Sequence, residues 1–124
     1  MSRKILVADD EPNIVISLEY LMKREGYTVL VARDGQEALD TITRDRPDLV
    51  LLDVMMPKKS GFEVCQAVRA NEELQATKIL MLTAKGRDTD LAKGLALGAD
   101  AYMTKPFSTR ELVQKVAEML GVQP

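Results

Sequence analysis

The chain of 124 residues contains no histidine and no tryptophan, and Cys65 is its single cysteine. Without histidine, Ser-His and Cys-His catalytic pairs and histidine-ligated metal sites are excluded. One cysteine cannot form an internal disulfide or a metal site built from several thiolates. Any chemistry at a site in this protein must therefore use carboxylates, hydroxyls and lysines.

An excess of basic charge and long apolar runs are also missing. The 17 Lys and Arg residues are outnumbered by 19 Asp and Glu residues, so a basic face for nucleic acid is not expected. No apolar run approaches the roughly 20 residues of a membrane-spanning helix, and MSRKILVADD does not read as a secretory signal. We expect a cytoplasmic, acidic protein with one domain, residues 1–124, in which residues 121–124 are a tail or the start of a linker.

The chain does contain a regular alternation of apolar runs and amphipathic segments. Most of the runs are continuously apolar and rich in Val, Ile and Leu, which is typical of strands covered on both faces. Five strands alternating with helices predict an α/β, doubly wound parallel sheet. The runs cover residues 4–8, 28–32, 48–53, 78–82 and 100–104.

Five helical patterns accompany these runs. The first has an apolar stripe from Ile14 to Met22, and the second follows the sequence DGQE. S-x-x-E motifs at residues 60–63 and 108–111 predict capping boxes that open the third and fifth helices. A weaker fourth helix is expected over residues 91–98, where a central glycine costs about 1 kcal/mol relative to alanine.

Polar residues follow the strands at their carboxyl ends, which meet at the ligand-binding edge of an open parallel sheet. Asp9 and Asp10 follow the first run, and Asp53 ends the third. Thr83 follows the fourth run and Lys105 the fifth. Carboxylates roughly 5 Å apart repel by about 3 kcal/mol at an effective dielectric near 20, so a cation is expected among them. Carboxylates suit Mg²⁺, and a lysine beside a hydroxyl suits phosphate.

Four blocks in order resemble the receiver domain of two-component response regulators: ILVADDEP, DLVLLDVMMPKKSG, ILMLTAK and GADAYMTKPF. The resemblance spans the whole chain. It implies a flavodoxin-like sheet of five parallel strands in the order 2-1-3-4-5, with five helices on its two faces. It also implies a signalling switch that catalyses only its own aspartate phosphorylation and dephosphorylation, and is not otherwise an enzyme.

The resemblance assigns a phosphorylation site and a metal site. In receivers the aspartate that ends the third strand accepts the phosphoryl group, which implies Asp53 as the acceptor in a phosphorelay. Asp9 and Asp10 would hold Mg²⁺ together with Asp53, and the backbone carbonyl of Met55 is implied as a further ligand. The ion would neutralise charge on the phosphoryl oxygens.

The same resemblance assigns the response to phosphorylation. Lys105 is expected to pair with one phosphoryl oxygen, while the hydroxyl of Thr83 binds another. Tyr102 matches the switch aromatic, which turns inward when the threonine moves. Lys105–Pro106 matches the Lys-Pro step of the family, whose peptide bond is characteristically cis.

The implied partners follow from this assignment. A histidine kinase or a phosphotransfer protein would supply the phosphoryl group. A downstream target protein, or a C-terminal effector domain absent from this chain, would read the remodelled face of the fourth helix, fifth strand and fifth helix. Direct binding of nucleic acid or membrane by this domain is not expected, and phosphorylation-promoted dimerisation is left open.

Two other functions remain open at this stage. A Mg²⁺-dependent aspartyl-phosphate phosphatase of the haloacid dehalogenase type also uses an aspartate nucleophile, but it carries the pattern D-x-D after its first strand, whereas Asp9 and Asp10 are adjacent. A phosphorylation-independent binding module with the receiver fold is the second alternative. The complete set of acids, Thr83 and Lys105 argues against it.

Single residues also have simpler interpretations. Asp10 or Glu11 could serve only as a cap for the first helix, which begins near Pro12. Tyr102 could be an ordinary strand residue, and Cys65 is expected to be an inert core residue. A last group is interpreted as a solvated basic rim: Lys58, Lys59, Lys85 and Arg87.

Overall fold

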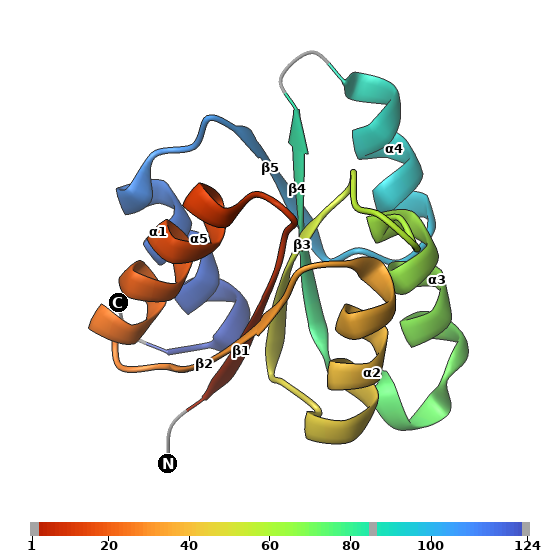
Figure 1. The fold of residues 1–124 in the computed structure, drawn as a ribbon, viewed down its shortest axis with the longest axis horizontal. Helices are drawn as coiled ribbons and strands as arrows, with labels where there is room; N and C mark the ends of the chain where they lie inside the picture. Colours follow the sequence, from red (N-terminus) through yellow and green to blue (C-terminus); the bar gives the residue numbers. More distant parts are fainter. Residues whose placement is uncertain (1–2, 85–86, 123–124) are drawn as a thin grey trace.

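A computed structural model describes residues 3–84 and 87–122 as a parallel sheet between two layers of helices (Figure 1). The strands are β1 (Lys4–Ala8), β2 (Thr28–Ala32), β3 (Leu49–Asp53), β4 (Lys78–Ala84) and β5 (Ala101–Lys105). The helices are α1 (Pro12–Arg24), α2 (Gly35–Asp45), α3 (Gly61–Ala70), α4 (Asp88–Ala96) and α5 (Thr109–Leu120), with a short 3₁₀ helix, η1 (Glu72–Leu74). Within these residues no helix is both long and apolar enough to cross a membrane.

The strand order is β2-β1-β3-β4-β5, and every neighbouring pair is parallel. This confirms the predicted flavodoxin-like fold. The chain leaves β1 toward β2 on one side and then returns to place β3 on the other side of β1. The carboxyl ends of β1 and β3 therefore lie side by side, which is where such sheets bind ligands.

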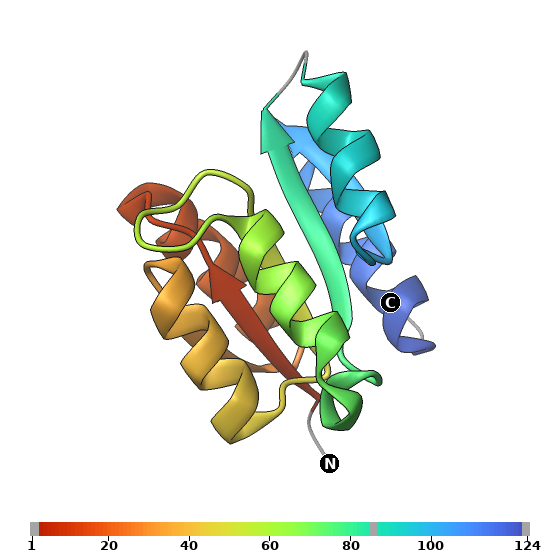
Figure 2. The same cartoon turned by 90° about the vertical axis from the view of Figure 1, so that its right-hand side faces the viewer.

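Alternate residues of the central strands enter two separate cores, because successive side chains of a strand point to opposite faces. On one face, Ile5 and Leu51 pack with residues of α1 and α5, including Leu18 and Val116. On the other face, Leu6 and Val50 pack with α2 and α3. Figure 1 shows α1 and α5 on one side of the sheet and α2, α3 and α4 on the other, and Figure 2 shows the second side. The central strand β3 is buried throughout, while the edge strands are partly exposed.

The helix starts follow local side-chain chemistry. At α3 both halves of the predicted capping box form, between Ser60 and Glu63. At α5 the hydroxyl of Ser108 accepts the N–H of Glu111 at 3.3 Å. At α1 the capping interpretation is wrong in its detail: Glu11 occupies the N-cap position, but its side chain makes no capping hydrogen bond. Glutamate is longer than the residues that cap well, and α1 begins with a proline, which needs no acceptor.

The bounds of β3 and β5 differ by one residue from those predicted by the apolar pattern, and those of β4 and α4 differ by more. β4 runs two residues past the predicted end, because Thr83 and Ala84 pair with β5. α4 begins at Asp88, three residues before the predicted start. Its first turn is polar and carries Asp88 and Asp90, which the helix dipole stabilises but which an apolar pattern cannot reveal.

We predict that the Ser60→Ala substitution lowers the free energy of unfolding by about 1 kcal/mol, because the N–H of Glu63 loses its acceptor. Ser17→Ala is the matched control, since Ser17 is exposed within α1 and alanine favours helix interiors. Urea unfolding of both variants checks this. Equal stability of Ser60→Ala and wild type would mean that the box contributes nothing.

Candidate functional site

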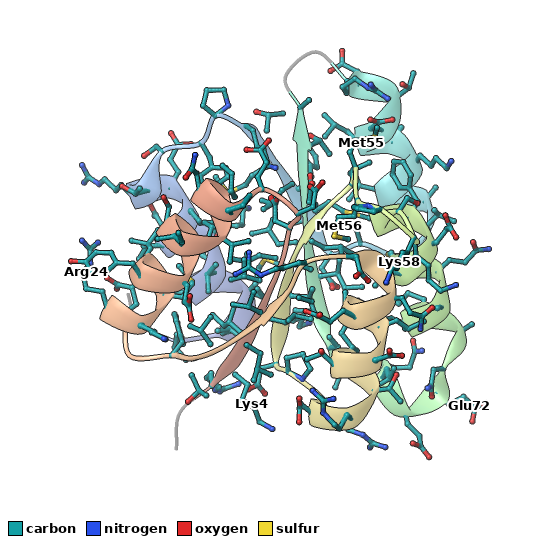
Figure 3. The ribbon with its side chains drawn as sticks, in the orientation of Figure 1. Lys4, Arg24, Met55, Met56, Lys58 and Glu72 are labelled. Atoms are coloured by element: carbon teal, nitrogen blue, oxygen red, sulfur yellow. The ribbon has the colours of Figure 1, made fainter. Side chains whose placement is uncertain are left out.

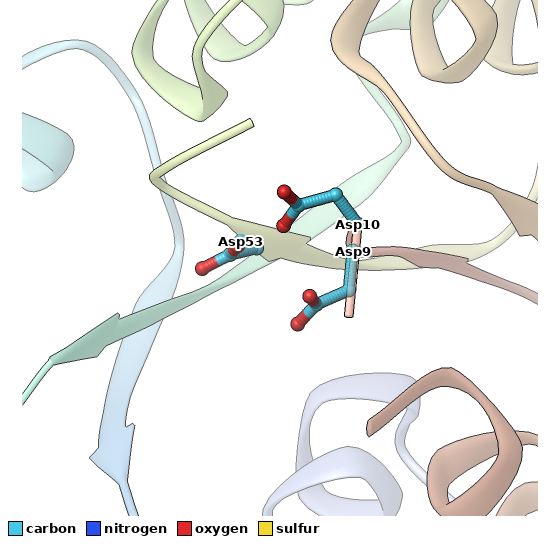
Figure 4. A group of neighbouring side chains, drawn as sticks. All are labelled: Asp9, Asp10 and Asp53. Carbon is cyan, nitrogen blue, oxygen red and sulfur yellow. The ribbon is translucent and has the colours of Figure 1, made fainter. Parts of the chain in front are cut away.

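Three carboxylates converge at the carboxyl edge of β1 and β3. Asp9 and Asp10 directly follow β1, where the N–H of Asp9 donates to the carbonyl of Ala32 at 3.1 Å and so continues the pairing with β2. Asp53 is the last residue of β3. One carboxylate oxygen from each aspartate lies within 4.8 Å of the others, and Figure 4 shows the three side chains turned toward a common space. The predicted meeting of these acids is therefore observed.

Lys105 reaches this group from the far side of β4. It ends β5, and its Nζ donates to Oδ2 of Asp9 at 2.9 Å and to Oδ1 of Asp53 at 3.2 Å. Asp9 is fully buried and Asp53 is 7% exposed, so these are short contacts in a partly desolvated setting. The peptide bond between Lys105 and Pro106 is cis, where the resemblance implied one. One ammonium group is thus shared by two carboxylates.

Burial and crowding change the acidity of this group. The pKa of Asp53 is raised from 3.8 to about 6: desolvation is the largest cause, the negative charges of Asp9 and Asp10 act in the same direction, and Lys105 opposes the shift. Burial would lower the pKa of Lys105, but its hydrogen bond to Asp9 and the charges of both acids raise it overall. The lysine therefore stays charged at neutral pH, and the site still has an excess of negative charge.

The hydroxyl of Thr83 is buried beside this group without a hydrogen-bond partner among the described residues. Thr83 is 1% exposed and lies in β4, one residue beyond the pairing of Leu82 with Asp53. A buried hydroxyl without a partner costs about 1–3 kcal/mol. Thr83 lies near the carboxyl end of β4, as the sequence predicts, and a contact between its hydroxyl and a ligand stays a prediction.

The acids open into a cavity of about 360 Å³, which is lined by residues of β3, β4, β5 and the start of α4. Gly61 packs tightly against the end of β3, because a Cβ at that position would lie 2.4 Å from the carbonyl oxygen of Asp53. α3 can therefore begin directly against the end of β3. Met55 lines the cavity and is 65% exposed. Figure 3 places it at the carboxyl edge of the sheet, opposite Lys4 at the other edge.

Tyr102 lies apart from the cavity. It is 42% exposed on β5 and borders a second hollow of about 490 Å³ between β5 and α5. This outward position is the starting position that the resemblance implies for a switch aromatic. Cys65 is fully buried, and burial raises the pKa of its thiol, in agreement with an inert core residue.

Two residues of the predicted solvated basic rim, Lys58 and Arg87, are exposed as expected, and each also forms an ion pair. Lys58 pairs with Asp34 at 3.6 Å. Arg87 pairs with Asp90 at 2.9 Å, and both of these residues line the cavity of the acids. The spacing of Arg87 and Asp90, three residues apart at a helix start, is the sequence signal that could have revealed this pair. Lys85, also assigned to the rim, lies outside the described residues.

The donor set fits a hard divalent cation. Mg²⁺ is bound in proteins by one or a few carboxylates while it keeps several waters, and the three aspartates present only oxygen ligands. The cavity and the partial exposure of the site leave room for such waters. An acidic site with a lysine and a free hydroxyl, at the carboxyl edge of a flavodoxin-like sheet, defines the class of protein.

Comparison with known proteins gives the family. The model of the response regulator receiver domain matches residues 5–117. The structure of a response regulator from Chloroflexus aurantiacus J-10-fl is 35% identical, with a TM-score of 0.93 over 98% of this chain and 99% of that chain. The Vibrio cholerae chemotaxis response regulator CheY4 is 34% identical, with a TM-score of 0.90 over 96% of this chain and 99% of that chain. The chain belongs to the response regulator receiver domain family, and the protein is a receiver domain of two-component signalling.

A third relative carries a metal. The receiver domain of the sensor histidine kinase PA1611 from Pseudomonas aeruginosa PAO1 is 29% identical, with a TM-score of 0.90 over 98% of this chain and 99% of that chain. Its structure has a magnesium ion coordinated in the active-site cleft.

The raised pKa of Asp53 predicts how stability depends on pH in the absence of metal. The folded protein binds this proton more tightly than the unfolded chain, so stability falls as the pH rises from about 4 to about 6. At pH 7.5 without divalent cations, Asp53→Asn should raise the melting temperature by about 3–6 °C, and the gain should shrink at pH 5. Calorimetry at both pH values checks this.

The matched control is Asp40→Asn, which removes an exposed carboxylate of α2 and should have little effect at either pH. An Asp53→Asn variant that melts at or below the wild-type temperature at pH 7.5 would show that the ionised carboxylate does not destabilise the fold.

Proposed function

We propose that this protein is a phosphorylation-dependent switch in which Asp53 accepts a phosphoryl group from a histidine kinase or a phosphotransfer protein. The observation that carries the proposal is the setting of Asp53. It lies in an open cavity between two neighbouring acids on one side and the ammonium group of Lys105 on the other. The ionised carboxylate of Asp53 therefore has two acids that can bind a cation on one side and the positive charge of Lys105 on the other.

Asp9, Asp10 and Asp53 are the residues that would hold Mg²⁺, with the backbone carbonyl of Met55 as a further ligand. When bound, the ion supplies charge neutralisation for the phosphoryl oxygens. The convergence of three carboxylates and the magnesium found in the Pseudomonas aeruginosa relative support this.

The reaction at Asp53 is a direct transfer. A carboxylate oxygen attacks the phosphorus of the phosphohistidine, the P–N bond breaks, and its electron pair leaves with the histidine nitrogen of the partner. The product is an acyl phosphate on Asp53. Lys105, released from its bond to Oδ1 of Asp53, pairs with a phosphoryl oxygen, which is a stronger acceptor because of its charge.

The output of the switch begins at Thr83. Its unpaired hydroxyl gains an acceptor when a phosphoryl oxygen arrives, so the end of β4 is drawn toward Asp53. Tyr102, exposed on the neighbouring strand, turns inward into the vacated space. The face formed by α4, β5 and α5, which contains the hollow beside Tyr102, then binds a downstream protein or an effector domain. Phosphorylation-promoted dimerisation through this face remains open.

A phosphatase of the haloacid dehalogenase type is the weaker candidate. Those enzymes place a second acid two residues after the nucleophile, and Met55 occupies that place here. Steady-state turnover of phosphomonoesters would favour that candidate. A phosphorylation-independent binding module is favoured if a phosphoryl mimic such as beryllium fluoride leaves the fluorescence of Tyr102 unchanged.

The direct test is phosphorylation by acetyl phosphate with Mg²⁺. We expect the intact mass of the wild type to increase by one phosphoryl group, with no increase for Asp53→Asn or when EDTA removes the metal. Asp40→Asn, which removes an exposed carboxylate elsewhere, should be modified at the wild-type rate. A wild type that gains no mass, or an Asp53→Asn variant that gains it equally, would refute Asp53 as the acceptor.

Thr83→Val separates phosphorylation from output. Because the hydroxyl has no hydrogen-bond partner among the described residues, its removal should raise the free energy of unfolding by about 1 kcal/mol. Phosphorylation of Asp53 should continue, but the change in Tyr102 fluorescence on addition of beryllium fluoride should disappear.

The matched control for this variant is Thr28→Val, on the exposed edge strand β2, which should respond as the wild type does. A Thr83→Val variant with a normal fluorescence response would show that the hydroxyl does not carry the signal.

A further inference from the structure

The cavity that contains Asp53 has a second cation at its rim. Arg87 and Lys105 both line it, but from different elements, since Lys105 ends β5 and Arg87 precedes α4. Nothing in the reaction described above uses Arg87. Its Nε contacts Oδ2 of Asp90 at 2.9 Å, and its side chain is 51% exposed. Arg87 therefore lines the same cavity as Asp53 and is held there by an ion pair with an aspartate whose side chain is 13% exposed.

The charge balance of the proposed reaction calls for this cation. With Mg²⁺ bound, the charges of the three aspartates, the metal and Lys105 cancel. An acyl phosphate replaces the single negative charge of Asp53 with about two. One negative charge is then left without a partner in a cavity where charges are poorly screened. Among the described residues lining this cavity, Arg87 and Lys105 are the basic ones.

Asp90 can release Arg87 at low cost. It lies in the first turn of α4, where the positive end of the helix dipole stabilises a carboxylate by about 0.3–1 kcal/mol. A phosphoryl group offers arginine a doubly charged, bidentate acceptor in place of this single carboxylate. Arg87 therefore gains a stronger acceptor when it leaves Asp90 for the phosphoryl group. The dipole of α4 continues to stabilise the charge of Asp90.

We propose that Arg87 is a second cationic contact for the phosphoryl group on Asp53, which Asp90 holds at the rim of the cavity until that group arrives. The proposal rests on the proposed function of Asp53. It adds a contact from the start of α4, so that the phosphoryl group acts on this helix directly as well as through Thr83. Arg87 thereby stabilises the phosphorylated state, while the ion pair with Asp90 lowers the affinity of the unmodified protein for phosphoryl groups.

The test measures the affinity of the Mg²⁺-loaded protein for beryllium fluoride by ¹⁹F NMR, in the wild type and in three variants. Arg87→Gln should bind about tenfold more weakly, equivalent to about 1.4 kcal/mol, and Arg87→Lys should recover part of this loss. Asp90→Asn should bind about threefold more tightly, because it frees the arginine. Arg44→Gln is the matched control, since Arg44 also forms an exposed ion pair, with Asp45 on α2, and it should bind like the wild type.

Two further measurements separate a direct contact from other effects. Mg²⁺ affinity without beryllium fluoride should not fall in Arg87→Gln, because the arginine acts on the phosphoryl group. The loss caused by Arg87→Gln should persist in about 1 M salt, where the Debye length is about 3 Å. A loss that disappears in salt would indicate only a long-range field and would overturn the proposal.

Two patterns of affinity would also overturn it. One is wild-type affinity in Arg87→Gln. The other is an equal loss in Arg87→Gln and Asp90→Asn, since that would show that the ion pair merely supports α4. Failure of the proposed function would give a different result: the wild type would not be phosphorylated on Asp53 and would not bind beryllium fluoride. Arg87 would then have no phosphoryl group to bind.

Discussion

The repulsion among three carboxylates held at one edge of the sheet is the constraint on which the site depends. β1 and β3 are neighbours in fixed register, so Asp9 and Asp53 cannot separate without disrupting the central pairing of the sheet. Lys105 compensates part of the charge, and the pKa of Asp53 is still raised, first by burial and then by the charge of Asp9. A cation is the natural complement of this arrangement. In the proposed function, binding of a metal ion and a phosphoryl group would relieve this repulsion.

The energy of the proposed switch must come from several contacts. Moving a conformational equilibrium from 1:99 to 99:1 needs about 5.5 kcal/mol, whereas one charge-assisted hydrogen bond contributes about 1.5–3 kcal/mol. The hydroxyl of Thr83 gains a partner that it does not have in the described structure, and Arg87 would add a second contact. Binding of the downstream partner completes the shift. Tyr102 and the hollow between β5 and α5 are the surface through which that partner would act.

The sequence predicted the parts of this structure that obey simple patterns. Buried parallel strands leave continuous apolar runs, so Asp9, Asp53 and Lys105 could be located at strand ends. The strand order that brings these ends together was implied by the resemblance to receiver domains. The ion pair of Arg87 and Asp90 was not predicted, because a charged residue before a helix is expected to be solvated unless its partner is known. Likewise the early start of α4 has no apolar signal. That the hydroxyl of Thr83 lacks a partner is a property of three-dimensional packing, and only the structure shows it.

The central claim is that Asp9, Asp10 and Asp53 form a single metal site, and calorimetric titration of Mg²⁺ tests it most directly. At pH 7.5 the account predicts one ion per chain in the wild type. It predicts binding at least about tenfold weaker in Asp10→Asn, a variant in which the exposed member of the group loses its charge without leaving a cavity in the core. Equal Mg²⁺ affinity in the two proteins, or no saturable binding in the wild type, would contradict it.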